Sequence, residues 1–221
     1  MSQIPVTIPR DHITGLVLAG GRGSRMGGVD KGLQLLADKP MAQWCAERLA
    51  PQVGMVAINA NRNMAAYTAL GWPVVADLPG LTAADDAFPG PLAGFAAGLA
   101  ACTTPWLLTV ACDTPLFPVD LAATMAQVAT AQNALVVMAS TPLDGAETSS
   151  HTRALPQPAF CLIHTSLAAS VHDFVAGGGR KIRQWTQQHP HAFSPFGDAS
   201  AFYNANTPQD LVHLHSLMAA G

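Results

Sequence analysis

The fold is indicated first by residues 13–31, which read ITGLVLAGGRGSRMGGVDK. The first six of these residues form a β-branched and leucine run that stops at a Gly-Gly pair, the pattern of a buried strand that feeds a turn. The glycines that follow let backbone N–H groups approach an anion closely. Arg22, Arg25 and Lys31 lie in the same segment. Because these cations would repel one another without an anion between them, the segment predicts a phosphate-binding loop.

The loop matches neither of two common nucleotide-binding motifs. Gly21 and Gly23 could begin a dinucleotide fingerprint, but Met26 stands where its third glycine belongs. A Walker A loop is excluded because Lys31 is followed by Gly32, not by Ser or Thr. The alternative, a glycine loop that binds nothing, leaves the three cations unexplained.

Strand-like and helix-like runs alternate through the next part of the chain. Further strands are expected at residues 55–58, 74–76, 107–111 and 135–138. Helices are expected at residues 40–49, 64–70, 92–101 and 121–131. This alternation predicts an α/β fold, a single three-layer domain with a mostly parallel, Rossmann-like sheet covered on both faces. Residues 141–157, rich in Ser, Thr, Pro and Gly, are expected to form a long loop before an apolar stretch at 159–163.

Composition excludes several classes of protein. Hydrophobic residues make up 49% of the 221-residue chain and charged residues 11%, which argues against disorder. No apolar run reaches the ~20 residues that a membrane span needs. The opening residues MSQIPVTIPRDH lack the features of a secretory signal, so we expect a cytoplasmic protein without membrane contact. The net charge of −3 disfavours nucleic acid as a partner. The cysteines have no zinc-site spacing and are expected to be reduced core thiols: Cys45, Cys102, Cys112 and Cys161.

A glycine or a polar side chain follows each of four expected strands. The four residues are Gly20, Asn59, Asp77 and Asp113. Ligands of open parallel sheets bind beyond the carboxyl ends of the strands, so these residues are expected to share one site. A carboxylate at a strand tip, such as Asp113, suits a Mg²⁺ ion that bridges to phosphate oxygens. The alternative for Asp113 is a turn aspartate ahead of Pro115.

Residues 18–32, LAGGRGSRMGGVDKG, resemble the signature of the nucleotidyltransferases that activate sugar phosphates, isoprenoid precursors and molybdopterin. The likeness is greatest to the molybdopterin guanylyltransferase (molybdenum cofactor guanylyltransferase) branch. Further matches run in family order as Asn59-Ala-Asn61-Arg62, Asp77, Pro89-Gly-Pro-Leu-Ala-Gly94, Cys112-Asp113-Thr-Pro115 and Asn204-Ala-Asn206-Thr-Pro208. The segment between Asp77 and Pro89 is longer than the family pattern and carries Asp85 and Asp86, which leaves the shape of the nucleotide-side rim open.

The resemblance implies transfer of GMP from GTP to the phosphate of molybdenum-bearing molybdopterin, with release of pyrophosphate. The domain, residues 1–221, would have a nucleotide-binding half at about 13–115 and an acceptor-binding half at about 116–221. It also implies transient contact with proteins that deliver and accept the cofactor. Three alternatives stay open: a molybdopterin cytidylyltransferase, a sugar-phosphate nucleotidyltransferase and a non-catalytic nucleotide-binding scaffold.

By the same resemblance, individual residues acquire roles in GTP binding. The backbone of four residues would contact base and phosphates: Leu18, Ala19, Gly20 and Gly21. Arg25 and Lys31 would neutralise the triphosphate and the leaving pyrophosphate. Asp113 would hold Mg²⁺, the expected cofactor. Asn59 and Asp77 would lie in the nucleotide pocket.

Three further residues are assigned to the acceptor. Asn204 and Asn206 would lie near its phosphate by resemblance, but they could instead cap a helix expected from Pro208. Arg180 belongs to a second basic cluster, residues 177–183, which we assign to the pterin phosphate. The alternative for this cluster is a solvated glycine loop.

Overall fold

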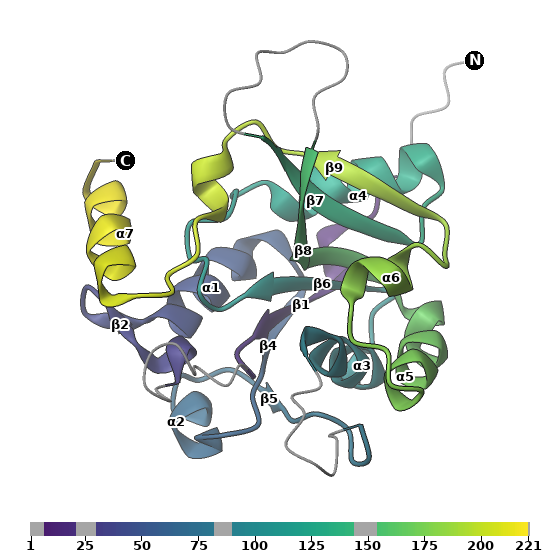
Figure 1. Cartoon of the computed structure of the whole chain (residues 1–221), viewed down its shortest axis with the longest axis horizontal. Helices are drawn as coiled ribbons and strands as arrows, with labels where there is room; N and C mark the ends of the chain where they lie inside the picture. Colours follow the sequence, from purple (N-terminus) through teal and green to yellow (C-terminus); the bar gives the residue numbers. More distant parts are fainter. Residues whose placement is uncertain (1–6, 21–29, 82–89, 144–153, 221) are drawn as a thin grey trace.

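The computed structural model describes residues 7–20, 30–81, 90–143 and 154–220. A seven-stranded sheet with the order β5-β4-β1-β6-β8-β7-β9 forms its centre (Figure 1). Its strands are β1 (Ile13–Leu18), β4 (Met55–Asn59), β5 (Val74–Val75), β6 (Trp106–Ala111), β7 (Val136–Pro142), β8 (Ala154–His164) and β9 (His191–Pro195). A small antiparallel pair is formed by β2 (Leu35–Leu36) and β3 (Lys39–Pro40).

The sheet is mostly parallel, as expected. Strand β1 pairs in parallel with β4 on one side and β6 on the other, and β5 and β9 extend the sheet at its edges in parallel. Among the described strands of this seven-stranded sheet, β8 alone runs antiparallel to its neighbours, β6 and β7. The strand order turns back at β1, where the register places Leu18 beside both Asn59 and Ala111. Ligands of open sheets bind at such a reversal point.

Helices cover both faces of the sheet, which confirms the three-layer prediction (Figure 1). On one face lie α1 (Met41–Leu49) and α4 (Leu121–Gln132). On the other lie α3 (Pro91–Ala101), α5 (Ala168–Ala176) and α6 (Ile182–Thr186). Neighbouring residues of β1 serve opposite cores, because strand side chains alternate: Val17 packs in the α1 and α4 core, and Leu16 in the α3 and α5 core.

The remaining helices lie near the carboxyl edge of the sheet or at its periphery. Helix α2 (Met64–Thr68) follows β4, and α7 (Pro208–Ala220) packs near β2. Short 3₁₀ turns complete the chain: η1 (Arg10–His12), η3 (Lys31–Leu33), η4 (Ala50–Gln52), η5 (Thr165–Leu167) and η6 (Ala199–Phe202). None of the described helices has the length and hydropathy needed to cross a membrane.

The expected elements between residues 13 and 138 are confirmed, but the expected loop at 141–157 is wrong at both ends. Strand β7 continues to Pro142, and β8 already begins at Ala154. The β7–β8 register jumps between Met138 and Ala139, so that Pro158 falls in the resulting bulge. A bulge accommodates a proline that a regular ladder excludes, and so the strand persists through a segment whose composition indicates a loop.

The prediction of core thiols is confirmed for three cysteines, while Cys102 is only partly buried. All four are free, and Cys45, Cys112 and Cys161 are buried. Burial raises the pKa of each of these three thiols, which keeps them protonated.

Candidate active site

The centre of the site is the ammonium group of Lys31. Its Nζ donates to Asp113 Oδ2 at 3.2 Å and to Asn206 Oδ1 at 2.6 Å. The Lys31 and Asp113 side chains are 21% and 19% exposed, so both partners of the ion pair are mostly covered but still accessible to water. Three residues far apart in the sequence are therefore brought together as a cation, a carboxylate and an amide.

The strand tips explain why these groups meet. Cys112 N donates to Leu18 O at 3.2 Å, which holds the turn after β6 beside the end of β1. Ala205 N donates to Asp113 O at 2.8 Å, and Thr114 Oγ1 donates to Asn204 Oδ1. The segment before α7 is thus bound directly to the turn that carries the carboxylate.

The structure also shows what caps α7. Asp210 N donates to Thr207 Oγ1 at 3.2 Å, while Asp210 Oδ2 accepts from the backbone N–H groups of Asn206 and Thr207, each at 2.8 Å. This is a reciprocal cap of the helix start. The side chain of Asn206 takes no part in it and accepts instead from Lys31. Tyr203 adds a hydrogen bond of 2.6 Å from its hydroxyl to Asp210 Oδ1.

A second polar group lies at the ends of β4 and β5. Asn59, which is 3% exposed, donates to Asp77 Oδ1 at 2.9 Å, and Asn61 Nδ2 donates to Asp77 Oδ2 at 2.8 Å. Asp77 N in turn donates to Asn61 Oδ1 at 2.8 Å. A Cβ at Gly20 would stand 3.1 Å from Asn61 Nδ2, so the glycine-rich loop begins against this group. The structure therefore brings Gly20, Asn59 and Asp77 together, three of the four residues that are expected to share one site.

The hydrogen bonds of the Arg180 side chain are made at the end of α5. Its Nη1 donates to Val175 O at 2.9 Å and to Gly179 O at 2.8 Å, closing the carboxyl end of α5. Its own carbonyl oxygen is 3.6 Å from the position that a Cβ at Gly90 would take, at the start of α3. The assignment of Arg180 to the acceptor stays a prediction. Outside the described residues lie Gly21, Arg25 and the acidic pair between Asp77 and Pro89, Asp85 and Asp86.

Some residues of the site have no counterpart in the sequence-based prediction. Asn61 belongs to a matching motif that gives it no role, and no pattern indicates the Tyr203–Asp210 pair. A Thr-x-x-Asp pattern at 207–210 is the one signal that could have identified Asp210, because it is a capping pattern. The hydrogen bond from the Tyr203 hydroxyl to Asp210 depends on how the chain folds before α7, and no local sequence pattern indicates it.

The donor set around Asp113 fits a magnesium ion held partly by a substrate. Among the described residues, no three His, Cys, Asp or Glu side chains gather as an all-protein metal site. Mg²⁺ commonly keeps several waters and is bound by one or two carboxylates together with phosphate oxygens. The single carboxylate of Asp113 beside the Lys31 ammonium matches that arrangement.

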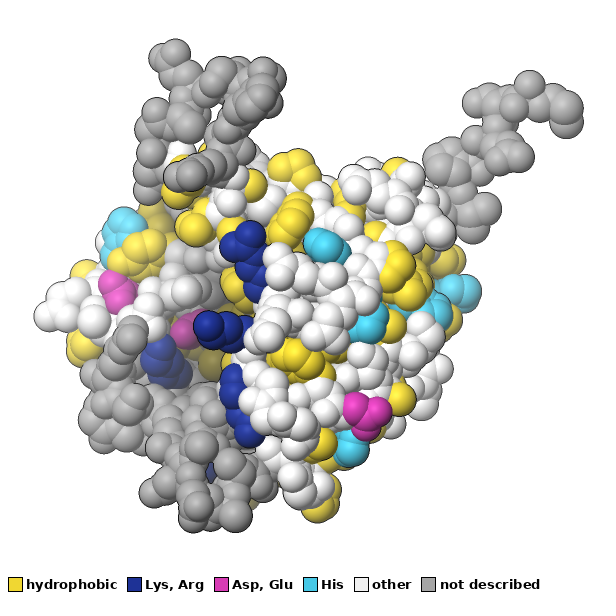
Figure 2. Space-filling model, turned by 45° about the vertical axis from the view of Figure 1, so that its right-hand side comes forward, with side chains coloured by type: hydrophobic (Ala, Val, Ile, Leu, Met, Phe, Trp, Pro, Cys, Tyr) yellow, Lys and Arg dark blue, Asp and Glu magenta, His cyan; other side chains and the backbone are white. Residues whose placement is uncertain are grey.

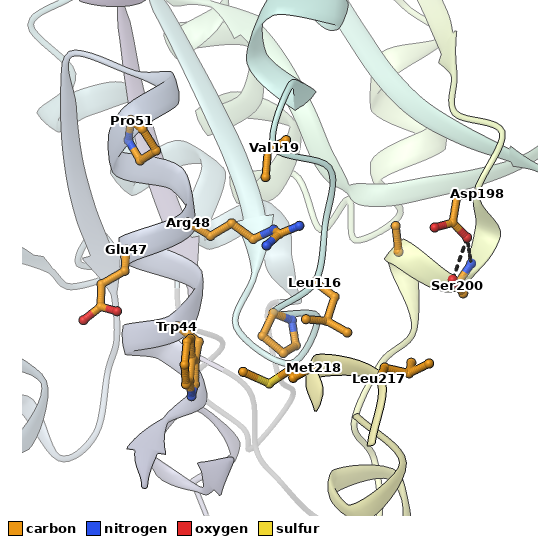
Figure 3. Close-up of a pocket in the computed structure, with 12 residues that line it drawn as sticks. Trp44, Glu47, Arg48, Pro51, Leu116, Val119, Asp198, Ser200, Leu217 and Met218 are labelled. Carbon is orange, nitrogen blue, oxygen red and sulfur yellow. Dashed lines mark hydrogen bonds between the residues drawn. The ribbon is translucent and has the colours of Figure 1, made fainter. Parts of the chain in front are cut away.

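Two pockets border α7, one near its start and one near its end. One, of about 540 Å³, is lined by the site residues Asn204 and Asn206 with Leu143, Leu155 and Gln157 among others. The other, of about 760 Å³, lies between α1, the loop after β6 and α7 (Figure 3). In it, Arg48 points across the space and donates to Phe117 O. None of the residues predicted for the site lines this second pocket.

Basic side chains gather on one face of the molecule. Figure 2 shows Lys and Arg side chains in a row along a hollowed part of one face. Such a grouping in a chain with few charges indicates an anionic ligand.

Comparison with known proteins identifies the family. A family model described as a MobA-like NTP transferase domain matches residues 15–192. The chain is 55% identical over 218 residues to the molybdenum cofactor guanylyltransferase of Acidovorax sp. (strain JS42), covering 97% of this chain and 99% of the relative. It is 51% identical over 207 residues to that of Ralstonia nicotianae, covering 94% of this chain and 98% of the relative.

Solved structures share the fold at lower identity. The molybdopterin-guanine dinucleotide biosynthesis protein A from Archaeoglobus fulgidus aligns with a TM-score of 0.71 and 19% identity, over 94% of this chain and 100% of that chain. The 2-C-methyl-D-erythritol 4-phosphate cytidylyltransferase from Thermus thermophilus aligns with a TM-score of 0.69 and 18% identity, over 93% of this chain and 98% of that chain. Because the family model covers most of the chain and the relatives are more than half identical over nearly all of it, the protein belongs to the MobA-like NTP transferase family, together with the molybdenum cofactor guanylyltransferases, and is a nucleotidyltransferase.

Proposed function

We propose that the enzyme transfers GMP from GTP to the phosphate of molybdenum-bearing molybdopterin and releases pyrophosphate. The observation that carries the proposal is the Lys31–Asp113–Asn206 contact at the reversal point of the sheet, in a chain whose relatives are named molybdenum cofactor guanylyltransferase. Nothing in this chemistry requires a general base, because the attacking phosphate is already ionised near neutral pH. Catalysis then depends on positioning and on neutralisation of charge.

The reaction forms one P–O bond and breaks another. An oxygen of the acceptor phosphate attacks the α-phosphorus of GTP, and the bond to the β-phosphate oxygen breaks as pyrophosphate leaves. Lys31, whose ammonium pairs with Asp113 in the structure, would neutralise the charge that accumulates on the leaving group. When Mg²⁺ is bound, Asp113 is the residue that would hold it, and the ion would supply Lewis-acid neutralisation of phosphate oxygens.

The nucleotide would occupy the β1, β4 and β5 ends of the site. The backbone of 18–21 would contact base and phosphates, with Arg25 adding positive charge. Asp77 has both carboxylate oxygens ordered by amide donors, and remaining lone pairs can accept from guanine N–H groups or ribose hydroxyls. This ordering supports a specificity role for Asp77.

The acceptor would enter by the pocket of about 540 Å³ beside Asn204 and Asn206. Leu143, Leu155 and Phe202 supply apolar surface there, and Gln157 supplies a polar edge. A flat heterocycle that carries a phosphate needs this mixture, with the phosphate directed toward Lys31.

The test is incubation of the purified enzyme with GTP, Mg²⁺ and molybdopterin, followed by detection of a GMP adduct and of pyrophosphate. CTP in place of GTP, and omission of Mg²⁺, are run in parallel. We expect product with GTP and Mg²⁺ only. A preference for CTP would make the guanylyl assignment wrong, and nucleotide binding without pyrophosphate release would indicate a scaffold.

A further inference from the structure

A buried charge lies next to the central lysine. Among the described residues, Asp30 is the one Asp, Glu, Lys or Arg that is buried, with 7% of its surface exposed. A buried carboxylate is costly unless its oxygens accept hydrogen bonds. The role proposed above for Lys31 makes no use of this carboxylate, although Asp30 directly precedes Lys31 in the chain.

Both oxygens of Asp30 are held by residues at α2. Tyr67 donates its hydroxyl to Asp30 Oδ1 at 2.5 Å, and Asn63 Nδ2 donates to Oδ2 at 3.0 Å. Asn63 has a left-handed backbone (φ 50°), a conformation that Asn tolerates better than most residues. Burial raises the pKa of Tyr67, so its hydroxyl stays protonated and available as a donor.

The Asp30 carboxylate does not cap the turn that it begins. Asp30 stands at the N-cap of the 3₁₀ turn η3, where an Asp side chain commonly accepts from the backbone of the turn. Here the side chain makes no cap hydrogen bond, and the turn is closed by the backbone bond from Leu33 N to Asp30 O at 3.2 Å. The carboxylate instead connects the end of the glycine-rich loop to a different element.

The packing of Tyr67 against the loop is equally close. A Cβ at Gly32 would lie 2.4 Å from the Tyr67 hydroxyl and 3.3 Å from Ala19 Cβ. Glycine at position 32 is therefore what allows the tyrosine to reach Asp30. Tyr67 is fully buried, and Ala19 belongs to the same core cluster. The start and the end of the glycine-rich loop thus meet at one rigid aromatic side chain.

We propose that Asp30, Tyr67 and Asn63 form a positioning unit that fixes the backbone of Lys31, so that its ammonium reaches both Asp113 and the reacting phosphates. The unit does not touch substrate, and its effect on rate rests on the proposed function. Fixing the backbone restricts the ammonium to the small volume in which it can exchange Asp113 for a phosphate oxygen. Misplacement of a catalytic group by about 1 Å can cost roughly 100-fold in rate.

Two variants test the unit through kinetics. Tyr67→Phe keeps the ring and removes the donor to Asp30. Asn63→Gly keeps the left-handed backbone at an exposed position and removes the other donor. We expect kcat to fall about 10- to 100-fold in each, with little change in KM for GTP, because positioning acts in the transition state.

A core variant provides the matched control. Ile163→Val removes one buried methyl group on the opposite face of the sheet, in the α3 and α5 core. It should lower the melting temperature by an amount comparable to Tyr67→Phe while kcat stays at the wild-type value. An equal loss of kcat in Ile163→Val would show that general destabilisation explains the effect, and would overturn the proposal.

A second readout needs no catalytic activity. The chain has three lysines, Lys31, Lys39 and Lys181, so lysine labelled with ¹³C at Cε gives three resolvable NMR signals, and Lys31→Arg assigns the first. In Tyr67→Phe and Asn63→Gly the Lys31 signal should move toward that of the exposed Lys181, while the other two signals stay unchanged. A folded Tyr67→Phe enzyme with an unmoved Lys31 signal contradicts the proposal, whatever its kcat. If the wild-type enzyme shows no transfer from GTP and the Lys31 signal still moves, the positioning unit stands and the proposed function fails.

Discussion

The ammonium group of Lys31 pairs with Asp113 and is also expected to contact a substrate phosphate. In the structure its ammonium neutralises Asp113 and is ordered by the amide of Asn206. An ammonium group has three donors, so these two contacts leave one N–H without a partner among the described residues. The same group can therefore meet a phosphate oxygen before it gives up either protein contact.

Removing this charge should affect the rate more than binding. For Lys31→Ala we expect kcat to fall at least ~100-fold, the scale of losing one preorganised charge-stabilising contact. Pyrophosphate release measured over a range of GTP concentrations separates kcat from KM. A loss confined to KM would instead indicate uniform binding of ground and transition states. Lys31→Arg is the control, because it keeps the charge on a wider, planar group.

Asp113 can be tested without endangering the fold. Its side chain is partly exposed, and the bond that Ala205 N makes to it uses the backbone carbonyl, which Asp113→Ala retains. We expect turnover to be lost at every Mg²⁺ concentration while the melting temperature stays close to that of the wild type. Pyrophosphate release at a near wild-type rate would show that Asp113 is not the metal ligand.

At the start of helix α7 a single carboxylate organises the acceptor side of the site. Asp210 accepts from the Tyr203 hydroxyl and from two backbone N–H groups, and one of these belongs to Asn206, the partner of Lys31. Helix α7 therefore also contributes to the candidate site. Its first turn fixes the loop that places Asn206.

This carboxylate predicts an acid dependence of stability. The hydrogen bond from Tyr203, together with those from the backbone, lowers the pKa of Asp210 to about 2. Because the folded-state pKa lies below the ordinary value of 3.8, its stabilisation is fully present above about pH 4 and is lost as the pH falls toward 2. Melting temperatures of the wild type and Asp210→Asn should converge over this range. Thr207→Ala removes the cap hydroxyl but keeps the carboxylate, so it should retain the acid dependence.

The elements show which features a sequence can predict. Strands β1 and β6 are predictable because each is a short apolar run that ends at a glycine or an aspartate, and parallel pairing places those ends together. Strand β8 is not, because Pro156 and Pro158 lie in its first part and a bulge accommodates the second. Edge strand β9 also lacks a clear pattern, since its buried positions hold only Ala192 and Ser194.

The candidate site divides in the same way. The pairing of Asn59 with Asp77 follows from the neighbouring positions of β4 and β5, which strand order can suggest. The bond from Tyr67 to Asp30 joins residues 37 apart by a side-chain contact. Asp30 lies in the 18–32 signature, but the signature gives it no role, and no pattern marks Tyr67. Supporting contacts of this kind become visible only when the chain is folded.

For the molecule as a whole, helix α3 is the element that connects the sheet core to the nucleotide side. Gly94 and Gly98 lie one turn apart on its face toward the sheet, and each is closely packed. A Cβ at Gly94 would lie 2.5 Å from Asn59 Oδ1 and 2.9 Å from Leu18 Cδ2. A Cβ at Gly98 would lie 2.5 Å from Leu16 Cδ2, inside the α3 and α5 core. The same face of α3 therefore contacts the proposed nucleotide pocket at Gly94 and only hydrophobic core residues at Gly98.

Two alanine variants separate these two functions of α3. Each adds one methyl group to a filled space, and such overpacking costs roughly 1–3 kcal/mol, so both should lower the melting temperature. Gly94→Ala should in addition displace Asn59 and release Asp77, and so raise KM for GTP, whereas Gly98→Ala should leave KM unchanged. Urea unfolding and GTP titrations on the two purified variants provide both quantities. Equal KM values for GTP in the two variants would contradict this prediction. They would mean that displacing Asn59 does not change GTP binding, and so that the Asn59–Asp77 pair does not contact the nucleotide.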